Sequence, residues 1–133
     1  MRAMREQDDA GLRVADTDSK GRGVYAERAF AAGEVVTEAP VIVIPSREWK
    51  AIEPTVIGDY CFAWGPQDRD AALVLGIGSL FNHATDPNCE PVRVEDDELM
   101  QFVATRDIAI GEELTISYRD ARTDPRPLWF EPA

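Results

Sequence analysis

Gly76-Ile77-Gly78-Ser79-Leu80-Phe81-Asn82-His83-Ala84-Thr85-Asp86-Pro87-Asn88 is the most unusual stretch of the chain and holds its one histidine. A metal site needs about three protein ligands, and His83 with the scattered Cys61 and Cys89 does not make a recognisable set. A serine or cysteine nucleophile paired with His83 lacks the Gly-x-Ser-x-Gly turn that presents many such nucleophiles. The residues alone favour a hydrogen-bonded, buried histidine and predict no metal.

A second informative stretch, residues 111–118, reads Gly-Glu-Glu-Leu-Thr-Ile-Ser-Tyr. Polar and apolar residues alternate along it, so Leu114, Ile116 and Tyr118 share one face of a predicted strand and the residues between them point the other way. Tyr118 is therefore expected at the end of a buried stripe. A core tyrosine whose hydroxyl bonds a backbone group is its plainest interpretation.

Two segments of the chain repeat one pattern. Residues 28–37 and 106–115 both follow Arg-x-apolar-Ala-x-Gly-Glu-x-apolar-Thr. Each copy predicts an apolar anchor, a tight turn at Gly33 or Gly111, and the beginning of a strand. Ten residues are too few for a repeat architecture, so the pattern indicates two similar corners in a mostly β domain.

The remaining predicted elements are short. Pro40 separates two β-branched runs, 35–37 and 41–44, which predict two strands. Ser46 is a candidate cap for a short helix over 47–52 that Pro54 stops. Residues 71–75 fit a helical turn or a buried strand equally well. Further strands are predicted over 12–14, 24–26 and 60–64, and a hairpin over 92–95 and 99–104 with its turn at 96–98.

Length and composition bound the function. The 133 residues correspond to one domain, and 14 Lys and Arg against 25 Asp and Glu leave a net charge of −11. Such a chain repels nucleic acid and attracts basic peptides. Two cysteines make no disulfide framework, and no signal peptide or apolar run long enough for a membrane span is found. A reducing, intracellular location is expected, cytoplasmic or, in a eukaryote, nuclear.

Gly21-Arg22-Gly23 on its own predicts a tight turn or a backbone that a ligand can approach closely. In order along the chain, this motif, the Asn-His stretch with Pro87-Asn88, and the Gly-Glu-Glu-Leu-Thr-x-x-Tyr stretch resemble the SET-domain protein lysine methyltransferases. The resemblance runs from about Gly11 to Phe130, with residues 58–62 in the place of a weaker second motif. The short chain resembles the compact stand-alone viral and bacterial members.

The resemblance implies a mostly β, β-clip-like fold of several small sheets with short helices. Its C-terminal segment would thread through a loop as a pseudoknot and bring the Asn-His stretch beside Tyr118. Residues 11–119 would form the SET domain, after a flexible tail over 1–10. Residues 120–133 would close the site, in place of the cysteine-rich zinc segment of many relatives.

The resemblance also implies S-adenosylmethionine on one face and a lysine entering from the other through a narrow channel. Tyr118 would be catalytic at the transferring methyl group, with Tyr60 near the cofactor or the channel. The residues that would hold the cofactor are Lys20, Gly21, Arg22, Gly23, Asn82, His83, Trp129 and Phe130. Methyl transfer to an amine is an in-line displacement, so the protein mainly has to align the reacting atoms.

The expected substrate is a lysine of a basic protein such as a histone or histone-like protein. Two alternatives stay open: a module that binds a lysine peptide with little or no turnover, and an enzyme acting on a ribosomal or other non-chromatin protein. A small SET domain without flanking domains exposes apolar surface, which favours a homodimer. Ala84, Thr85 and Ser117 depart from common family residues, and none of these changes removes a group that the chemistry needs.

Overall fold

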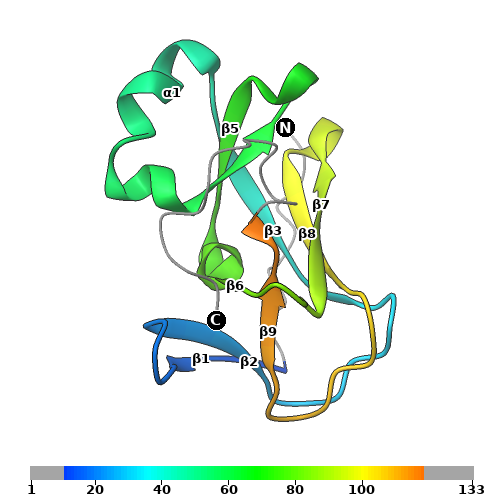
Figure 1. Ribbon diagram of the computed structural model, residues 1–133. Coiled ribbons are helices and arrows are strands. Elements are labelled where there is room, and N and C mark those ends of the chain that lie inside the picture. The colour runs from blue at the N-terminus through cyan, green and yellow to red at the C-terminus, as the bar shows by residue number, and fades with distance from the viewer. Residues whose placement is uncertain (1–10, 119–133) are drawn as a thin grey trace.

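The computed structural model describes residues 11–118, and there the chain is mostly β, as expected (Figure 1). Two sheets have the strand orders β1-β2-β9-β6 and β4-β5-β3-β8-β7. The strands are β1 (Leu12–Asp16), β2 (Arg22–Ala26), β3 (Val35–Ile44), β4 (Cys61–Trp64), β5 (Asp70–Val74), β6 (Asn82–His83), β7 (Cys89–Val94), β8 (Leu99–Ala104) and β9 (Glu113–Ile116). The helices are α1 (Ser46–Ile52) and the short 3₁₀ segments η1 (Val56–Tyr60), η2 (Pro66–Asp68), η3 (Gly76–Leu80) and η4 (Glu95–Asp97).

Strand β3 corrects the prediction of two separate strands over 35–37 and 41–44. Its first half pairs with β8 and its second half, from Val41, pairs with β5. Pro40 lies where the strand changes partner, so its missing N–H interrupts neither ladder. Its carbonyl oxygen still accepts a hydrogen bond from the amide of Leu75 at 3.0 Å.

Other local predictions are decided by neighbours in space. Of residues 71–75, which fitted either type, 71–74 belong to strand β5, paired on both sides by β3 and β4. The predicted hairpin is confirmed by the pairing of β7 with β8. Helix α1 is confirmed, but Ser46 does not cap it: the cap position is Pro45 and there is no side-chain cap. The amide of Ser46 instead donates to Asp70 Oδ1 at 2.9 Å.

One buried cluster joins the two sheets. It includes Val24 and Leu114 from the first sheet and Phe102 from the second, all fully buried. Phe81, which precedes β6, stacks on Phe102 with ring centroids 4.4 Å apart, and Phe62 meets Phe102 edge-on at 6.1 Å. These aromatic contacts hold the start of the Asn-His stretch against the core.

The two predicted corners are confirmed and face one another. Phe30 and Ile108 exchange both backbone hydrogen bonds, at 3.0 and 2.8 Å. In the first corner (residues 28–37) Glu34 accepts from the Ala31 amide and pairs with Arg28; in the second (residues 106–115) Glu112 accepts from the Ala109 amide and pairs with Arg106. The same local contacts therefore recur 78 positions along the chain.

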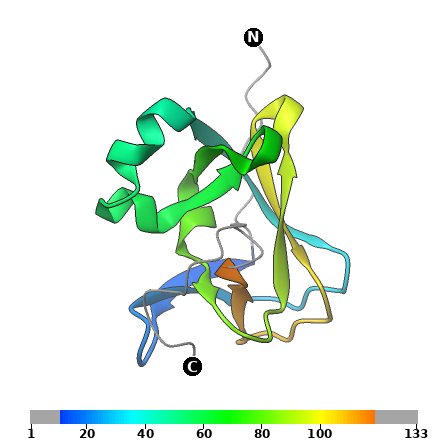
Figure 2. The ribbon, with the colours of Figure 1, turned by 45° about the horizontal axis from the view of Figure 1, so that its top comes forward.

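The parallel pairing of β6 with β9 places the Asn-His stretch beside the closing motif. Asn82 lies opposite Thr115 and His83 opposite Ile116. Figures 1 and 2 show β9, in orange, between the blue β1–β2 hairpin and the β7–β8 hairpin. The expected N-terminal tail, the threading after Tyr118 and the closing segment over 120–133 lie outside the described residues. Over residues 11–118 the structure has no helix long and apolar enough to cross a membrane.

Candidate active site

The three sequence motifs meet on three neighbouring strands. The Gly-x-Gly motif leads into β2, the closing motif forms β9, and the Asn-His pair is β6, in the order β2-β9-β6. Residues about 60 and 90 positions apart in the sequence thus come into hydrogen-bonding range. Strand β9 is the central element, since it contacts both of the others.

Tyr118 is held at both ends by the Asn-His stretch. Its amide donates to His83 Nδ1 at 3.1 Å, and its hydroxyl donates to the Phe81 carbonyl oxygen at 3.1 Å. The two rings lie 5.3 Å apart between centroids. His83 is buried, as predicted, and because Nδ1 accepts a hydrogen bond, the proton of its neutral ring is on Nε2.

The phenol of Tyr118 is a protonated donor at neutral pH. Burial, followed by the electrostatic effects of Tyr60 and Glu113, raises its pKa to about 12. Tyr60, at the end of η1, is 39% exposed.

Asn82 connects all three motifs. Its Nδ2 donates to the carbonyl oxygen of Arg22 at 2.9 Å and to Glu113 Oε2 at 2.8 Å. The Arg22 contact belongs to the Gly-x-Gly motif and the Glu113 contact to the closing motif. Arg22 therefore contributes its backbone to the site.

Glycine is favoured at the two positions of the Gly-x-Gly motif for different structural reasons. Gly21 has a φ of +73°, which favours glycine. At Gly23 a Cβ would lie 2.6 Å from Glu113 Oε2 and 2.9 Å from Asn82 Nδ2. The space beside Gly23 is therefore filled by the chain's own Asn82–Glu113 pair, which explains this glycine without a ligand.

Lys20, in the loop between β1 and β2, contacts the Asn-His stretch. Its Nζ donates to the carbonyl oxygen of His83 at 2.9 Å, and its amide donates to Thr17 Oγ1 at 2.7 Å. The hydroxyl of Thr17 in turn donates to the Gly21 carbonyl oxygen at 2.8 Å. A cationic group is thus fixed directly beside the Asn-His stretch.

The structure brings together the predicted residues of the Gly-x-Gly motif, the Asn-His stretch and the closing motif, and Tyr60 affects the pKa of Tyr118. Trp129 and Phe130 lie outside the described residues. Thr17 was missed by sequence reasoning, and Asn88 and Glu113 were quoted as parts of the motifs without a role in the site. The sequence does contain a signal for Glu113. The two copies of the repeated pattern differ at this position, where the first copy has the apolar Val35 and the second has a carboxylate.

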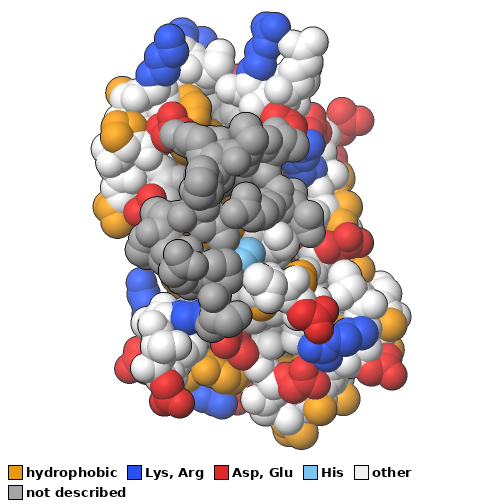
Figure 3. Space-filling view, in the orientation of Figure 1, with side chains coloured by type: hydrophobic (Ala, Val, Ile, Leu, Met, Phe, Trp, Pro, Cys, Tyr) orange, Lys and Arg blue, Asp and Glu red, His pale blue; other side chains and the backbone are white. Residues whose placement is uncertain are grey.

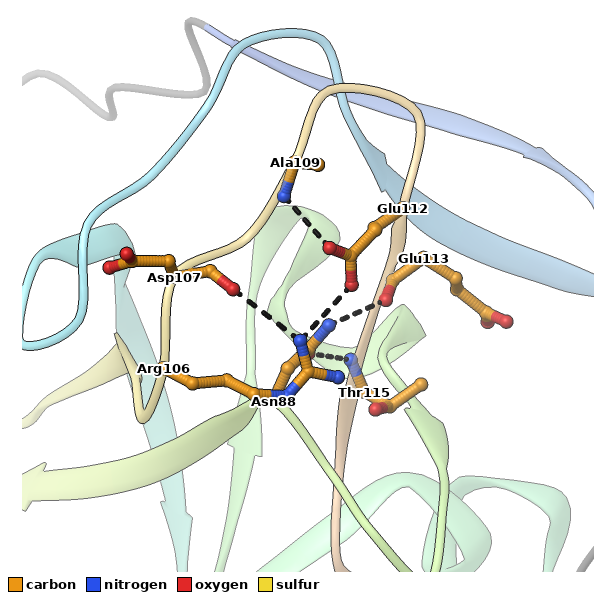
Figure 4. Close-up of polar contacts among 7 residues, drawn as sticks. All are labelled: Asn88, Arg106, Asp107, Ala109, Glu112, Glu113 and Thr115. Atoms are coloured by element: carbon orange, nitrogen blue, oxygen red, sulfur yellow. Dashed lines mark hydrogen bonds and ion pairs between the residues drawn. The ribbon is translucent and has the colours of Figure 1, made fainter.

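Asn88 fixes β9 from the other side (Figure 4). Its Nδ2 donates to the Glu113 carbonyl oxygen at 2.9 Å, and its Oδ1 accepts from the Thr115 amide at 2.8 Å. The side chain is 2% exposed, and both of its polar atoms replace a strand partner for β9. A hydrogen bond from Asn88 also helps to lower the pKa of Glu112, after those from Ala109 and Arg106.

A sequence model of the SET domain matches residues 21–119, about three quarters of the chain. The chain belongs to the SET-domain family. This SET domain is 33% identical over 121 residues to the H3 lysine-37 specific histone-lysine N-methyltransferase of Schizosaccharomyces pombe, covering 90% of this chain and 77% of that protein. It is 32% identical to N-lysine methyltransferase KMT5A of Xenopus tropicalis, covering 86% of this chain and 38% of that protein.

Among solved structures, the SET domain matches a candidate histone methyltransferase from Plasmodium falciparum with a TM-score of 0.64. The two are 22% identical, and the match covers 81% of this chain and 92% of that one, which supports the SET fold. Family and relatives confirm the expected class, the protein-lysine N-methyltransferases. Over residues 11–118, no three or more His, Cys, Asp or Glu side chains gather in a way that could hold a metal ion.

Proposed function

We propose that this SET domain transfers a methyl group from S-adenosylmethionine to a lysine of a basic protein, a histone or histone-like protein being the favoured substrate. The observation that carries the proposal is the anchored Tyr118 beside Asn82 and His83, at the meeting point of the three family motifs. The cofactor, when bound, supplies a methyl group on a positively charged sulfur. Lys20, Gly21, Arg22, Gly23, Asn82 and His83 would hold it.

The donor set of the site suits such a cofactor. S-adenosylmethionine carries an ammonium, a carboxylate and sugar hydroxyls, so it needs both acceptors and donors. The site offers the backbone of residues 20–23 and the Lys20 ammonium from the Gly-x-Gly region, and the Asn82 amide oxygen from the Asn-His stretch. Within the described part of the chain, hydrogen bonds connect Lys20 with His83 and Asn82 with Arg22, which supports a common binding surface.

The role of Tyr118 follows from its hydrogen bond. Its proton is directed at the Phe81 carbonyl oxygen, so the lone pairs of the phenol oxygen face away from that bond. Those lone pairs can accept a hydrogen bond from a neutral lysine amine and interact with a polarised methyl group. The lysine must lose a proton to react, since its free pKa is about 10.4, and an apolar channel favours the neutral form.

Charge supports a basic substrate. The chain carries a net charge of −11, and acidic side chains lie around the rim of the face shown in Figure 3, interspersed with basic ones. Such a field draws in a lysine-rich peptide and speeds its association. The Schizosaccharomyces pombe relative is named for a histone H3 lysine, which favours a histone over a ribosomal or other non-chromatin substrate.

Several expectations belong to the same proposal. Residues 11–119 would act as the catalytic domain, and residues 120–133 would close the cofactor and lysine sites, with Trp129 and Phe130 as covering side chains. An intracellular location and a homodimer stay predictions. A binding module with little turnover is the second candidate function, and the retained Tyr118, Asn82 and His83 argue against it.

The proposal is tested by transfer of labelled methyl groups from S-adenosylmethionine to histones, ribosomal proteins and cell extract, with mass spectrometry to locate the label. We expect lysine labelling that falls at least tenfold in Tyr118→Phe and in Asn82→Ala, because each loses a group of the reacting site. Tyr25→Phe is the matched control: the backbone of Tyr25 pairs with Glu113 across β2 and β9, whereas its ring faces the Arg13 guanidinium, 5.3 Å from the ring centroid.

Two results would contradict the proposal. Cofactor binding by calorimetry without transfer to any protein would favour the binding module. Labelling that Tyr118→Phe and Tyr25→Phe reduce equally would remove Tyr118 from the reaction.

A further inference from the structure

A carboxylate–amide pair joins the closing motif to the Asn-His stretch. Glu113 Oε2 accepts from Asn82 Nδ2 at 2.8 Å, and the Arg22 carbonyl oxygen accepts from the same nitrogen at 2.9 Å. We propose that Glu113 is a positioning residue for the cofactor, because it holds the Asn82 side chain in the single orientation that presents the amide oxygen to the ligand. This inference rests on the proposed function.

The orientation follows from the chemistry of the two partners. A backbone carbonyl and an ionised carboxylate can only accept, so the amide nitrogen and not the amide oxygen must face them. Both hydrogens of Nδ2 are then committed, and Oδ1 is left as an acceptor. Without Glu113 one of these two partners is gone, and rotation of the amide would cost less.

The repeated corners show that the turn does not require this carboxylate. The first corner has Val35 where the second has Glu113, and Val35 is 43% exposed. The first corner nevertheless makes the same turn, with Gly33 at a φ of +86° against +91° for Gly111. The turn therefore does not need Glu113, and the reason for this carboxylate lies in the site.

Gly23 is an independent sign that the pair is built into the site. Any side chain at this position would put its Cβ 2.6 Å from Glu113 Oε2. The first motif thus leaves space for the pair, and the pair in turn fixes the motif through the Arg22 carbonyl oxygen. An acceptor held in this way selects a hydrogen-bond donor on the cofactor.

The test compares Glu113→Val, which installs the residue of the first corner, with Glu113→Gln, which keeps an acceptor. Glu38→Val is the matched control, because Glu38 lies in a strand of the other sheet and accepts from the Gln101 side-chain amide at 2.9 Å. Calorimetry with S-adenosylhomocysteine measures affinity in each protein. We expect roughly tenfold weaker binding in Glu113→Val and a smaller loss in Glu113→Gln, with the wild-type value in Glu38→Val.

Two further readouts separate positioning from folding. The Asn82 side-chain amide resonances, assigned by their loss in Asn82→Asp, should move in Glu113→Val without ligand and stay in place in Glu38→Val. The KM for the lysine substrate should stay within about twofold of wild type, because the proposal places the lysine on the face opposite the cofactor.

Equal affinity in wild type and Glu113→Val would overturn the inference, as would equal weakening in Glu113→Val and Glu38→Val. Should Glu113→Val not fold, Asn82 resonances and an affinity that both stay at the wild-type values in Glu113→Gln would overturn it too. Absence of cofactor binding in the wild-type protein is a different result: it would overturn the proposed function itself.

Discussion

At the scale of single residues, Tyr118 shows how a core side chain and a reactive one can be the same group. Sequence alternation predicts a core tyrosine, and the structure packs it against the buried cluster with its hydroxyl on the Phe81 carbonyl oxygen. The same bond aims the phenol oxygen, and burial keeps it protonated. A core tyrosine and a catalytic tyrosine therefore require the same placement of the Tyr118 side chain.

The raised pKa of Tyr118 predicts a loss of stability in alkali. Below pH 10 the phenol is protonated in both states, so it has no effect on the pH dependence. Between 10 and about 12 the unfolded chain releases the proton first, so the free energy of unfolding falls as pH rises. Urea unfolding on both sides of pH 10 should show a steeper alkaline loss in wild type than in Tyr118→Phe; parallel curves would contradict this.

At the scale of elements, β9 departs from the simple strand pattern. Thr115 was expected to point away from the buried stripe, yet it is only 8% exposed. The reason is that β9 lies between β2 and β6 and is also contacted by β7, so both of its faces are covered. Its amide is satisfied by Asn88, a side chain that a pattern along one strand does not include.

The two corners predict matched effects of glycine replacement. Gly33 and Gly111 have φ values of +86° and +91°, and neither would place a Cβ within 4 Å of another atom. Alanine at either position should therefore cost only backbone strain, about 1–2 kcal/mol. The free energies of unfolding of Gly33→Ala and Gly111→Ala should be lowered by similar amounts; a much larger loss at one corner would show that the corners are not equivalent.

At the scale of the whole molecule, the two sheets are joined by a shared core and by Asn88. This residue immediately precedes β7 of the second sheet and bonds β9 of the first. The hydrogen bonds between Asn88 and β9, here called the Asn88 joint, lie on the strand next to the Asn-His pair. The geometry of the site therefore depends on how the two sheets pack. Stability and site geometry are therefore coupled through β9.

Asn88→Asp tests this joint with almost no change of volume. The carboxylate cannot donate to the Glu113 carbonyl oxygen, so two acceptors would face each other in a buried place. We expect the free energy of unfolding to fall by about 2–4 kcal/mol in urea titrations at neutral pH. Asp86→Asn, the reverse change nearby in the same loop, is the control. A stability within the error of wild type would mean that Asn88 does not join the sheets.

Much of the fold could be predicted because its signals are local. The hairpin of β7 and β8, helix α1 and the two corners follow from turn residues, β-branched runs and spacing within about ten positions. The one long strand β3 and the assignment of residues 71–74 to a strand could not, because both depend on which strands lie alongside. Pro40 looked like a boundary since a sequence does not show where a strand changes partner.

For the site, the sequence by itself determined the family motifs and their order, and hence the residues that a cofactor and a lysine would meet. Only the tertiary structure decided that Glu113 holds the Asn82 amide, that Gly23 leaves space for this pair, and that Asn88 bonds β9. The physical reason is range: a motif records which groups are present, whereas a hydrogen bond between residues 31 positions apart exists only once β2, β9 and β6 pair.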